Sequence, residues 1–351
     1  MDLKDFINSK NIALYMKELK PEKTLEKSLF PAKKVLGTKL EYAKGAKKKP
    51  IALRQSTFDV AAKMRSLSAE ITVKSTEIPF FKEACGIDET TRRELISAIG
   101  CNNENLVKAI SDQIFEGQVN LIKGSEIIPK AMAAQVLQNG VINYSSDAND
   151  GDVVVDYGVP ANHKVVLTST DKWTDPGADI VGDVKKWQKV LTDENYPKPT
   201  TLLLTESTFD NTFLINTAIK NHLNGNVMNQ NRILSQKDFL QFAKEIMGLT
   251  IVFLDDSTYY PYEGASAVQY YENNKITLMS GTSLGNTVYG VTPEEFDKTH
   301  GSGKLDTTMV GTGTAITTMV KEDPVTVDTK VSVMPIISFD RADEVFLATI
   351  G

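Results

Sequence analysis

Residues 131–142 read AMAAQVLQNGVI, and this stretch decides how the centre of the chain is organised. Small and apolar side chains lead up to Gln138, which predicts a helix over residues 125–138. Asn139 and Gly140 follow, and this pair is typical of a helix that ends in the left-handed region of backbone space. The stretch therefore predicts a helix that ends at residue 139 and a change of chain direction at Gly140.

Two more helices are predicted before this stretch. The first ends at Gly100, and its apolar positions are Leu95, Ile96 and Ile99. The second has Asn103 as its candidate N-cap. Its apolar face consists of Leu106, Val107, Ile110 and Ile114. The three helices together predict a rigid central element.

The N-terminal residues show a less regular pattern. Residues 1–30 read as a mobile arm with one short amphipathic helix, for which Ser9 is the candidate N-cap. The apolar face of this helix consists of Ile12, Tyr15, Met16 and Leu19. Because a helix of three turns is marginal alone, we expect it to dock on this chain or on another.

Residues 35–80 read as a long two-stranded excursion. One limb covers residues 35–42, the return passes through residues 51–53, and a second extended piece covers residues 71–73. The tip between the limbs reads KGAKKKP over residues 44–50 and is too polar and too basic to be buried. A solvated loop tip and a contact element are both compatible with this composition. The candidate contact residues are Lys44, Lys47, Lys48 and Lys49.

Strands and helices alternate between residues 150 and 255, which predicts a self-sufficient α/β unit. The expected strands are residues 153–155, 164–167, 201–205 and 250–254. The expected helices are residues 178–191, 206–223 and 235–247, the last of them closed by Gly248. Beyond this unit, residues 275–279 and the alternating valines of residues 325–333 predict a return to β structure.

Composition limits the class of protein. The chain has 351 residues, of which 41% are hydrophobic and 24% charged, as in ordinary globular proteins with two or three compact units. The polar start MDLKD and the lack of any long apolar run predict neither a signal peptide nor a membrane span, and therefore intracellular synthesis. Two cysteines exclude a disulfide framework, and three histidines leave little for a zinc site or an imidazole-based mechanism.

The net charge of −6 hides an asymmetry along the chain. Residues 1–50 carry thirteen lysines against six acidic residues, whereas the remaining residues carry a net charge of −13. A basic arm on an acidic body could bind nucleic acid or the acidic body of a neighbouring copy. The acidic balance of the whole chain argues against a dedicated DNA-binding protein.

The sharpest catalytic pattern is GTSLG at residues 281–285, a literal G-x-S-x-G around Ser283. A nucleophile elbow needs a strand before the serine and a helix after it. A strand is expected at residues 276–279, but the residues after the pattern favour β structure and turns. His300, with Asp297 nearby, is expected in a glycine-rich loop that suits a catalytic base poorly. A tight hairpin turn is favoured, and a serine hydrolase using Ser283 is the alternative.

Other ligand-binding patterns are incomplete. Residues 301–304 read GSGK but lack the following Ser or Thr of a P-loop, and residues 311–313 lack the third glycine of a dinucleotide fingerprint. The acidic residues 147–152 have Gly151 where a calcium ligand should be, and residues 255–256 fit a turn better than a metal site. We assign no catalytic, cofactor-binding or metal-binding residue.

Several stretches resemble one protein family in their order and spacing. They are residues 131–142, DYGVP at 156–160, WTDP at 173–176, DVKKW at 183–187 and GNTVYGVTP at 285–293. The closing residues, from VSVMP at 331–335 to RAD at 341–343, are similar to the final strands of the same family. From about residue 35 to its C-terminus, the chain thus resembles the major capsid proteins of tailed bacteriophages, specifically the lambda-type capsid protein E group.

The resemblance implies a Hong Kong 97-type shell fold of the α+β class and no enzymatic activity. Residues 1–34 would form an N-terminal arm and residues 35–80 an extended β-hairpin loop. Residues 81–150, with about 305–335, would form a peripheral domain with a long spine helix. Residues 151–304, with about 336–351, would form an α/β axial domain. The GTSLG pattern then becomes part of a structural turn.

The resemblance also implies a head protein that assembles into pentamers and hexamers of an icosahedral shell around double-stranded DNA. Its expected partners are other copies of itself, a scaffold, a portal and a decoration protein, with neither sequence-specific DNA binding nor a membrane. Its expected location is the virion, after synthesis in the cytoplasm of the bacterial host. Another phage structural protein, such as a tube or baseplate component, and an encapsulin-like container are alternatives. We expect the lysines of the tip to contact acidic surface on neighbouring copies rather than DNA.

Overall fold

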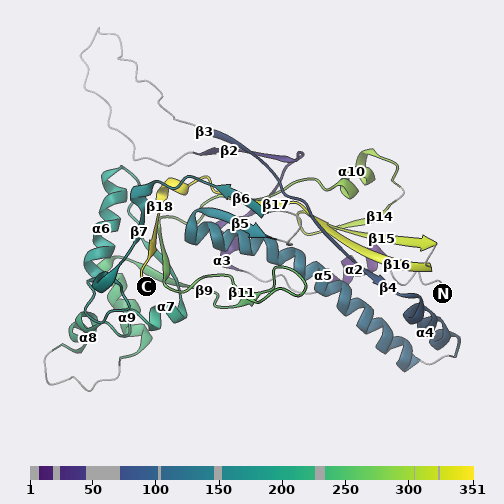
Figure 1. The fold of residues 1–351 in the computed structure, drawn as a ribbon, viewed down its shortest axis with the longest axis horizontal. Helices are drawn as coiled ribbons and strands as arrows, with labels where there is room; N and C mark the ends of the chain where they lie inside the picture. Colours follow the sequence, from purple (N-terminus) through teal and green to yellow (C-terminus); the bar gives the residue numbers. More distant parts are fainter. Residues whose placement is uncertain are drawn as a thin grey trace, which may run out of the picture. The chain divides into compact units, whose positions relative to one another are not determined.

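The computed structural model describes residues 8–18, 24–44, 72–101, 104–145, 152–225, 234–303, 305–322 and 325–351 (Figure 1). The chain divides into two compact units, each of which is built from three separate stretches of sequence. The first unit comprises Met1–Glu41, Ser75–Met132 and Asn286–Ser338. The second unit comprises Tyr42–Lys74, Ala133–Gly285 and Phe339–Gly351. Both units combine helices with sheets, as the predicted α+β class requires.

A four-stranded antiparallel sheet belongs to the first unit. Its strands lie in the order β14 (Asp306–Val310), β15 (Thr314–Glu322), β16 (Val325–Val333) and β4 (Phe81–Ile87). The predicted β structure of residues 325–333 is confirmed, and Val327, Val331 and Val333 are buried, but Asp328 and Ser332 on the other face are buried too. This sheet supplies the surface on which the helices of the first unit pack.

One long helix replaces two of the predicted ones. Helix α5 runs without interruption over Glu104–Asn139, so the expected separate helix starting at residue 125 is wrong. Pro129 lies inside α5 and is tolerated there, although proline removes a helical hydrogen bond. The expected end of the helix is confirmed, since Gly140 follows with a φ of +70°. The candidate cap Asn103 lies outside the described residues.

Helix α4 (Glu89–Gly100) ends at the predicted residue. Asp88 caps its N-terminus, where the side chain accepts a hydrogen bond from the backbone N–H of Thr91. Of the three apolar residues that indicated this helix, only Leu95 is buried, whereas Ile96 and Ile99 are exposed.

The described parts of the N-terminal arm pack onto the first unit. Helix α2 (Ser9–Glu18) contacts β14 and β15, and its Ile12 is fully buried beside Ile122 of α5. Asn8, not Ser9, caps α2, because the Asn8 side chain accepts from the backbone N–H of Asn11. The Ser9 hydroxyl instead donates to Asp306 at 2.8 Å. Docking of this helix on its own chain is therefore confirmed.

The arm continues through helix α3 (Leu25–Leu29) into a short strand, β1 (Ala32–Lys34). Strand β1 pairs in parallel with β13 (Asn286–Tyr289), which pairs in turn with β17 (Pro335–Ser338). Helix α10 (Pro293–His300) follows β13. Three distant parts of the sequence thus meet in one sheet of the first unit.

Of the predicted excursion over residues 35–80, the structure describes one limb and the second extended piece, and these two pair with each other. Strand β2 (Lys39–Lys44) pairs with β3 (Thr72–Glu77). Residues 45–71, which include the expected return through residues 51–53 and most of the lysine tip, lie outside the described residues.

The second unit contains a five-stranded mixed sheet in the order β7, β18, β12, β8 and β9. These strands are Lys164–Val166, Val345–Thr349, Lys275–Met279, Thr201–Thr205 and Thr250–Leu254. The four predicted strands among them are confirmed. Two of the five strands come from outside residues 150–255, so that segment alone does not complete its sheet.

Helices α6 (Ile180–Asp193) and α9 (Gln236–Phe242) bury their apolar residues against this sheet. The core contains a stack of aromatic rings in which Trp187 lies between Trp173 and Phe346, with both centroid distances 5.3 Å. A π-helical turn, Ala243–Met247, extends α9 and is closed by Gly248 at a φ of +67°.

The helix expected over residues 206–223 is wrong as a single element. It is divided into α7 (Glu206–Asp210) and α8 (Thr217–Asn224). Asn216 starts α8 as an N-cap, because its side chain accepts from the backbone N–H of Ile219 at 3.0 Å.

Two small antiparallel pairs complete the second unit. They are β5 (Val141–Ser145) with β6 (Asp152–Asp156), and β10 (Thr258–Tyr259) with β11 (Val268–Gln269). Short 3₁₀ turns cover Ala161–His163, Ser169–Asp171 and Ala342–Glu344. Within the described part of the chain, no helix combines the length and the apolar character that a membrane span requires.

Candidate assembly surface

Ser283 lies in a turn and not in a nucleophile elbow. The turn connects β12 to β13, so a strand follows the serine where an elbow needs a helix. The Ser283 hydroxyl donates to the backbone oxygen of Gly285 at 3.4 Å, and the guanidinium of Arg341 donates to the backbone oxygen of Ser283 at 3.0 Å. These bonds hold the turn, as the interpretation of a structural turn predicts.

His300 is the last residue of α10, so its expected place in a glycine-rich loop is wrong. Its ring stacks on Phe296, one turn earlier, at a centroid distance of 5.0 Å. Asp297 accepts hydrogen bonds from the backbone N–H and the hydroxyl of Ser302. The carboxylate of Asp297 thus shapes the C-terminal end of the helix.

The glycine-rich stretches have structural roles. Gly311 has a φ of +60° in the turn between β14 and β15. A side chain on Gly313 would meet the ring of Tyr289, because a Cβ there would lie 2.4 Å from the nearest ring atom. Close packing therefore accounts for the glycine at position 313. Lys304 of the GSGK stretch lies outside the described residues.

The acidic candidates do not form a metal centre in the described part of the chain. Asp255 accepts hydrogen bonds from the N–H and hydroxyl of Ser257, and Asp256 accepts from the backbone N–H of Ser207. This is the turn that the sequence favoured. No group of three His, Cys, Asp or Glu side chains among the described residues could hold a metal ion. Residues 146–151 lie outside the described residues.

His163 is fully buried in the second unit. Its Nε2 lies 3.1 Å from a carboxylate oxygen of Glu194, and its ring meets that of Tyr196 edge-on. Burial, followed by the charges of nearby carboxylates, raises the pKa of Tyr196. The arrangement is a packed polar contact inside a core and contains no nucleophile.

Two adjacent carboxylates at the start of α10 are bound by lysines from distant strands. Glu294 is almost fully buried and lies 2.6 Å from Nζ of Lys330, while the hydroxyl of Ser332 donates to its other oxygen at 2.8 Å. Burial alone would raise the pKa of Glu294. The hydrogen bonds from Lys330, from its own backbone N–H and from Ser332 outweigh burial and lower this pKa. Glu295 pairs with Lys34, so β1 and β16 are both tied to α10.

The lysine tip falls mostly outside the described residues. The backbone of Lys44 ends β2, but the structure does not describe its side chain, nor residues Lys47, Lys48 and Lys49. Their assignment to contacts between copies stays a prediction.

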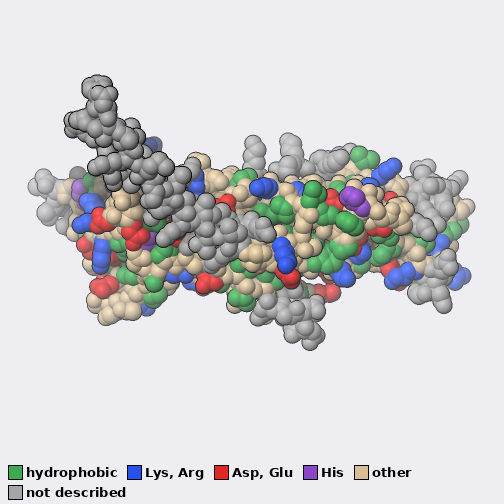
Figure 2. Space-filling view, turned by 90° about the horizontal axis from the view of Figure 1, so that it is seen from above, with side chains coloured by type: hydrophobic (Ala, Val, Ile, Leu, Met, Phe, Trp, Pro, Cys, Tyr) green, Lys and Arg blue, Asp and Glu red, His purple; other side chains and the backbone are tan. Residues whose placement is uncertain are grey.

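Exposed apolar side chains are the surface feature that sequence reasoning missed. In the second unit, Tyr260 is 65% exposed and Tyr262 and Val268 are also exposed, all in or beside the β10–β11 pair. The crowded tyrosines of YYPY at residues 259–262 were the available signal, because aromatic residues are enriched at protein interfaces. Figure 2 shows that apolar and charged side chains are interspersed over the face seen there. Contiguous exposed apolar groups mark interaction surfaces, so these three side chains are candidates for one.

A mixed fold whose catalytic patterns resolve into turns and caps, and which exposes apolar side chains, is compatible with a structural protein that acts by association. The comparisons agree with this class. The family model described as phage major capsid protein E matches residues 10–350. Among curated proteins, none matches this sequence.

Solved structures with a similar fold cover nearly the whole chain. A phage-related protein from Bordetella bronchiseptica RB50 has a TM-score of 0.54 at 10% identity, over 97% of both chains. A protein assigned as the capsid protein of an E. coli CFT073 prophage has a TM-score of 0.55 at 10% identity, over 98% of this chain and 99% of that one. At such low identity these likenesses show the fold alone.

The chain belongs to the phage major capsid protein E family. It is a major capsid protein, a structural component of the virion that assembles with copies of itself into a shell, and its role is not enzymatic. The predicted family, fold and function as a major capsid protein are thereby confirmed, and the serine hydrolase alternative is set aside.

Proposed function

We propose that this capsid protein forms pentamers and hexamers that close into an icosahedral shell around double-stranded DNA. The family match over residues 10–350 carries the proposal, and the similarity of fold over almost the whole chain supports it. Rings of five and six copies require a heterologous contact, in which one patch of each copy meets a different patch of the next.

The test is assembly of the purified chain, alone and with its scaffold. Light scattering and negative-stain microscopy should show closed particles of uniform size that display five-fold and six-fold capsomers. Protein that stays monomeric at high concentration, even with the scaffold supplied, would contradict the proposal.

The two compact units suggest that each subunit has two domains with different positions in the shell. In this proposal, residues 81–150 with about 305–335 form the peripheral domain, and residues 151–304 with about 336–351 form the axial domain around the capsomer axis. Residues 1–34 act as the arm, and residues 35–80 as a loop that extends to a neighbour. The division of the chain into two units built from interleaved stretches supports a two-domain organisation, although the units divide after Met132 and Gly285 and not after residues 150 and 304.

The proposal includes the partners and the site of synthesis. A scaffold, a portal and a decoration protein would join the shell, DNA would be enclosed without sequence-specific contacts, and no membrane would take part. Synthesis would occur in the cytoplasm of the bacterial host. Mass spectrometry of purified precursor and mature particles would identify the partners, and particles that contain only this chain at every stage would contradict them.

The lysines of the tip, Lys44, Lys47, Lys48 and Lys49, are proposed to contact acidic surface on neighbouring copies. The net charge of −13 outside residues 1–50 provides that surface. Each exposed ion pair contributes only about 0–1 kcal/mol, but the contact repeats in every subunit of a shell.

The variant K47E/K48E/K49E should therefore assemble poorly. A matched variant, K108E/K123E/K237E, changes the net charge equally at exposed lysines elsewhere and should assemble like the wild type. Normal assembly of the tip variant with reduced DNA retention would show that these lysines face the genome.

A further inference from the structure

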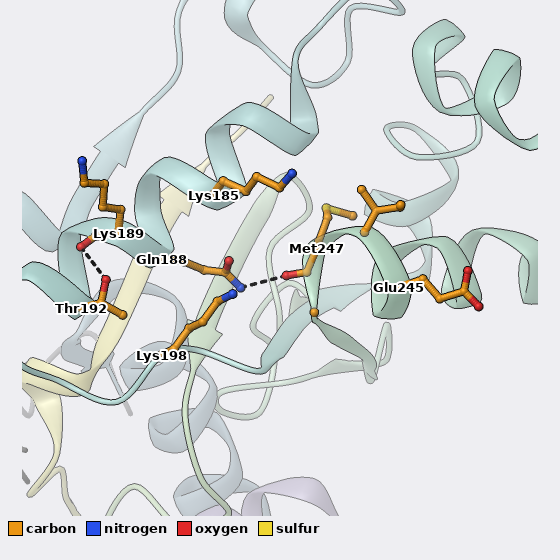
Figure 3. A pocket seen from close by; sticks show the side chains of 9 residues that line it. Lys185, Gln188, Lys189, Thr192, Lys198, Glu245 and Met247 are labelled. Atoms are coloured by element: carbon orange, nitrogen blue, oxygen red, sulfur yellow. Dashed lines mark hydrogen bonds between the residues drawn. The ribbon is translucent and has the colours of Figure 1, made fainter.

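A hollow of about 490 Å³ opens in the second unit between α6 and the π-helical turn Ala243–Met247 (Figure 3). Lys185 and Lys189, one helical turn apart on α6, line it together with Lys198 from the segment before β8. Glu245 lies on the opposite side. We call this feature the lysine hollow.

The buried side-chain amide of Gln188 connects α6 to the opposite wall of the lysine hollow. The side-chain nitrogen of Gln188 donates to the backbone oxygens of Pro199 and Met247, both at 3.1 Å. Because both bonds are buried, the spacing between α6 and the π-helical turn is well determined. The hollow is therefore part of the folded unit and not a gap between mobile loops.

The three lysines of the hollow form no ion pair with the described residues. Lys185, Lys189 and Lys198 are all exposed, and among the described residues no carboxylate lies within 4.0 Å of their ammonium groups. Ile246, which also lines the hollow, is 39% exposed and adds an apolar surface. This combination fits a segment that carries both carboxylates and apolar side chains.

The same unit presents such a segment. Residues 255–269, which we call the acidic ribbon, contain Asp255, Asp256 and Glu263 and no lysine or arginine. The ribbon exposes Tyr260 and Tyr262. It is a defined structure, since β10 pairs with β11 and the ring of Tyr259 stacks on that of Tyr270 at 4.6 Å.

We propose that the lysine hollow of one copy binds the acidic ribbon of the next copy around a capsomer. This inference rests on the proposed assembly into rings and names the contact that holds them. The two patches are different and complementary in charge, which is what a heterologous ring contact requires. Among the described residues no ion pair joins the lysines of the hollow to Asp256 or Glu263, and both of these side chains are exposed.

A second copy is a better occupant than nucleic acid. Ile246 offers an apolar surface that a phosphate backbone cannot use. The acidic ribbon matches both the lysines and this apolar surface, because its carboxylates can meet the lysines while its tyrosines cover Ile246.

Charge reversal in the full-length chain tests the contact. K185E/K189E and D256K/E263K should each lower the yield of closed particles about tenfold or more, because like charges would then face each other. The quadruple variant K185E/K189E/D256K/E263K should recover a yield within about threefold of the wild type. In this variant the ion pairs between hollow and ribbon are restored with the signs of the two partners exchanged. The control K186E/K237E, with equal charge change at exposed lysines outside the hollow, should assemble normally. Circular dichroism and thermal unfolding check that each variant is folded.

Mixing the two double variants gives a second readout. Each variant is incompatible with itself but complementary to the other, so copies must alternate around a ring. A ring in which the two variants alternate can close with six copies but not with five, because five is an odd number. The mixture should therefore give hexamers, as sheets or open tubes, and no closed shells.

The outcomes separate the two proposals. If the wild type forms no particles, the proposed assembly fails and this contact fails with it. If the wild type assembles and the double variants do so equally well, or the mixture closes into shells, only the contact is wrong. Normal assembly of K185E/K189E with loss of DNA would likewise overturn it, by showing that the hollow faces nucleic acid.

Discussion

Glu294 makes the first unit sensitive to acid. Its pKa is lowered from 4.5, because the donors around the carboxylate outweigh the effect of burial. A group with a depressed pKa stabilises the fold when ionised, so its contribution is complete well above pH 4.5 and is lost as the pH falls through the lowered value. Thermal unfolding followed from pH 7 to pH 3 should show this loss below about pH 4.5.

The variant Glu294→Gln should remove that part of the acid sensitivity and lower the free energy of unfolding at pH 7 by about 1–3 kcal/mol, since Lys330 loses its charged partner. Glu116→Gln, at an exposed position of α5, is the control and should change little. Equal stability of wild type and E294Q at pH 7 would show that the buried pair contributes nothing.

Ser283 and His300 should be dispensable for assembly. The Ser283 hydroxyl makes a long bond within its own turn, and the His300 ring stacks on a neighbouring residue of its own helix. Ser283→Ala should therefore change the free energy of unfolding by no more than about 0.5 kcal/mol, and both S283A and H300A should leave particle yield unchanged. A hydrolytic activity that disappears with S283A would revive the enzyme interpretation.

Two glycines of the same region should respond in opposite ways to alanine. Gly140 has a φ of +70°, and a Cβ there would lie 2.5 Å from a methyl group of Val159. Gly140→Ala should therefore destabilise the protein by about 1–3 kcal/mol. Gly124 lies inside α5 with open space around the position of a Cβ, so Gly124→Ala should stabilise by about 0.5–1 kcal/mol.

Denaturant unfolding of both glycine variants provides the measurement. Each variant is the control for the other, because both substitutions add one methyl group, either within α5 or directly after its last residue. A loss of stability in G124A equal to that in G140A would mean that α5 is not continuous through residue 124.

Helices and strands were largely predictable where a local sequence pattern determines their position. The valine alternation located β16, and the Asn-Gly pair located the end of α5. The continuity of α5 was not predictable, because it depends on the burial of Val119 and Ile122 against other parts of the first unit. The break in the predicted helix over residues 206–223 was not predictable either. It depends on Asn216 acting as the N-cap of α8, through a side-chain hydrogen bond that only the structure shows.

The candidate contact surface was less accessible from the sequence. The lysines of the hollow come from α6 and from the segment before β8, and Ile246 comes from the π-helical turn. Only the tertiary fold brings these residues together, so no local spacing could indicate them. The tyrosines of the acidic ribbon carried a signal, but exposure of an aromatic residue is a property of the folded unit.

At the scale of the whole molecule, the uneven charge should make assembly depend on salt. Charges on neighbouring copies interact over a Debye length of about 10 Å at 0.1 M salt, which falls to about 3 Å at 1 M. Particle yield should therefore decrease as sodium chloride is raised over this range, as measured by sedimentation. A yield that is unchanged or higher at 1 M would show that apolar burial, and not charge, dominates assembly.

The position of β18 sets the order in which a new subunit can mature. This strand, Val345–Thr349, lies between β7 and β12, although every other strand of the described chain is synthesised before it. The five-stranded sheet of the second unit therefore stays incomplete until residue 349 has left the ribosome. Strand pairing between residues so far apart in the sequence is slow to form. A chain that has not yet added β18 cannot complete the sheet of the second unit. The topology therefore delays the shape that neighbouring copies would contact until this strand is in place.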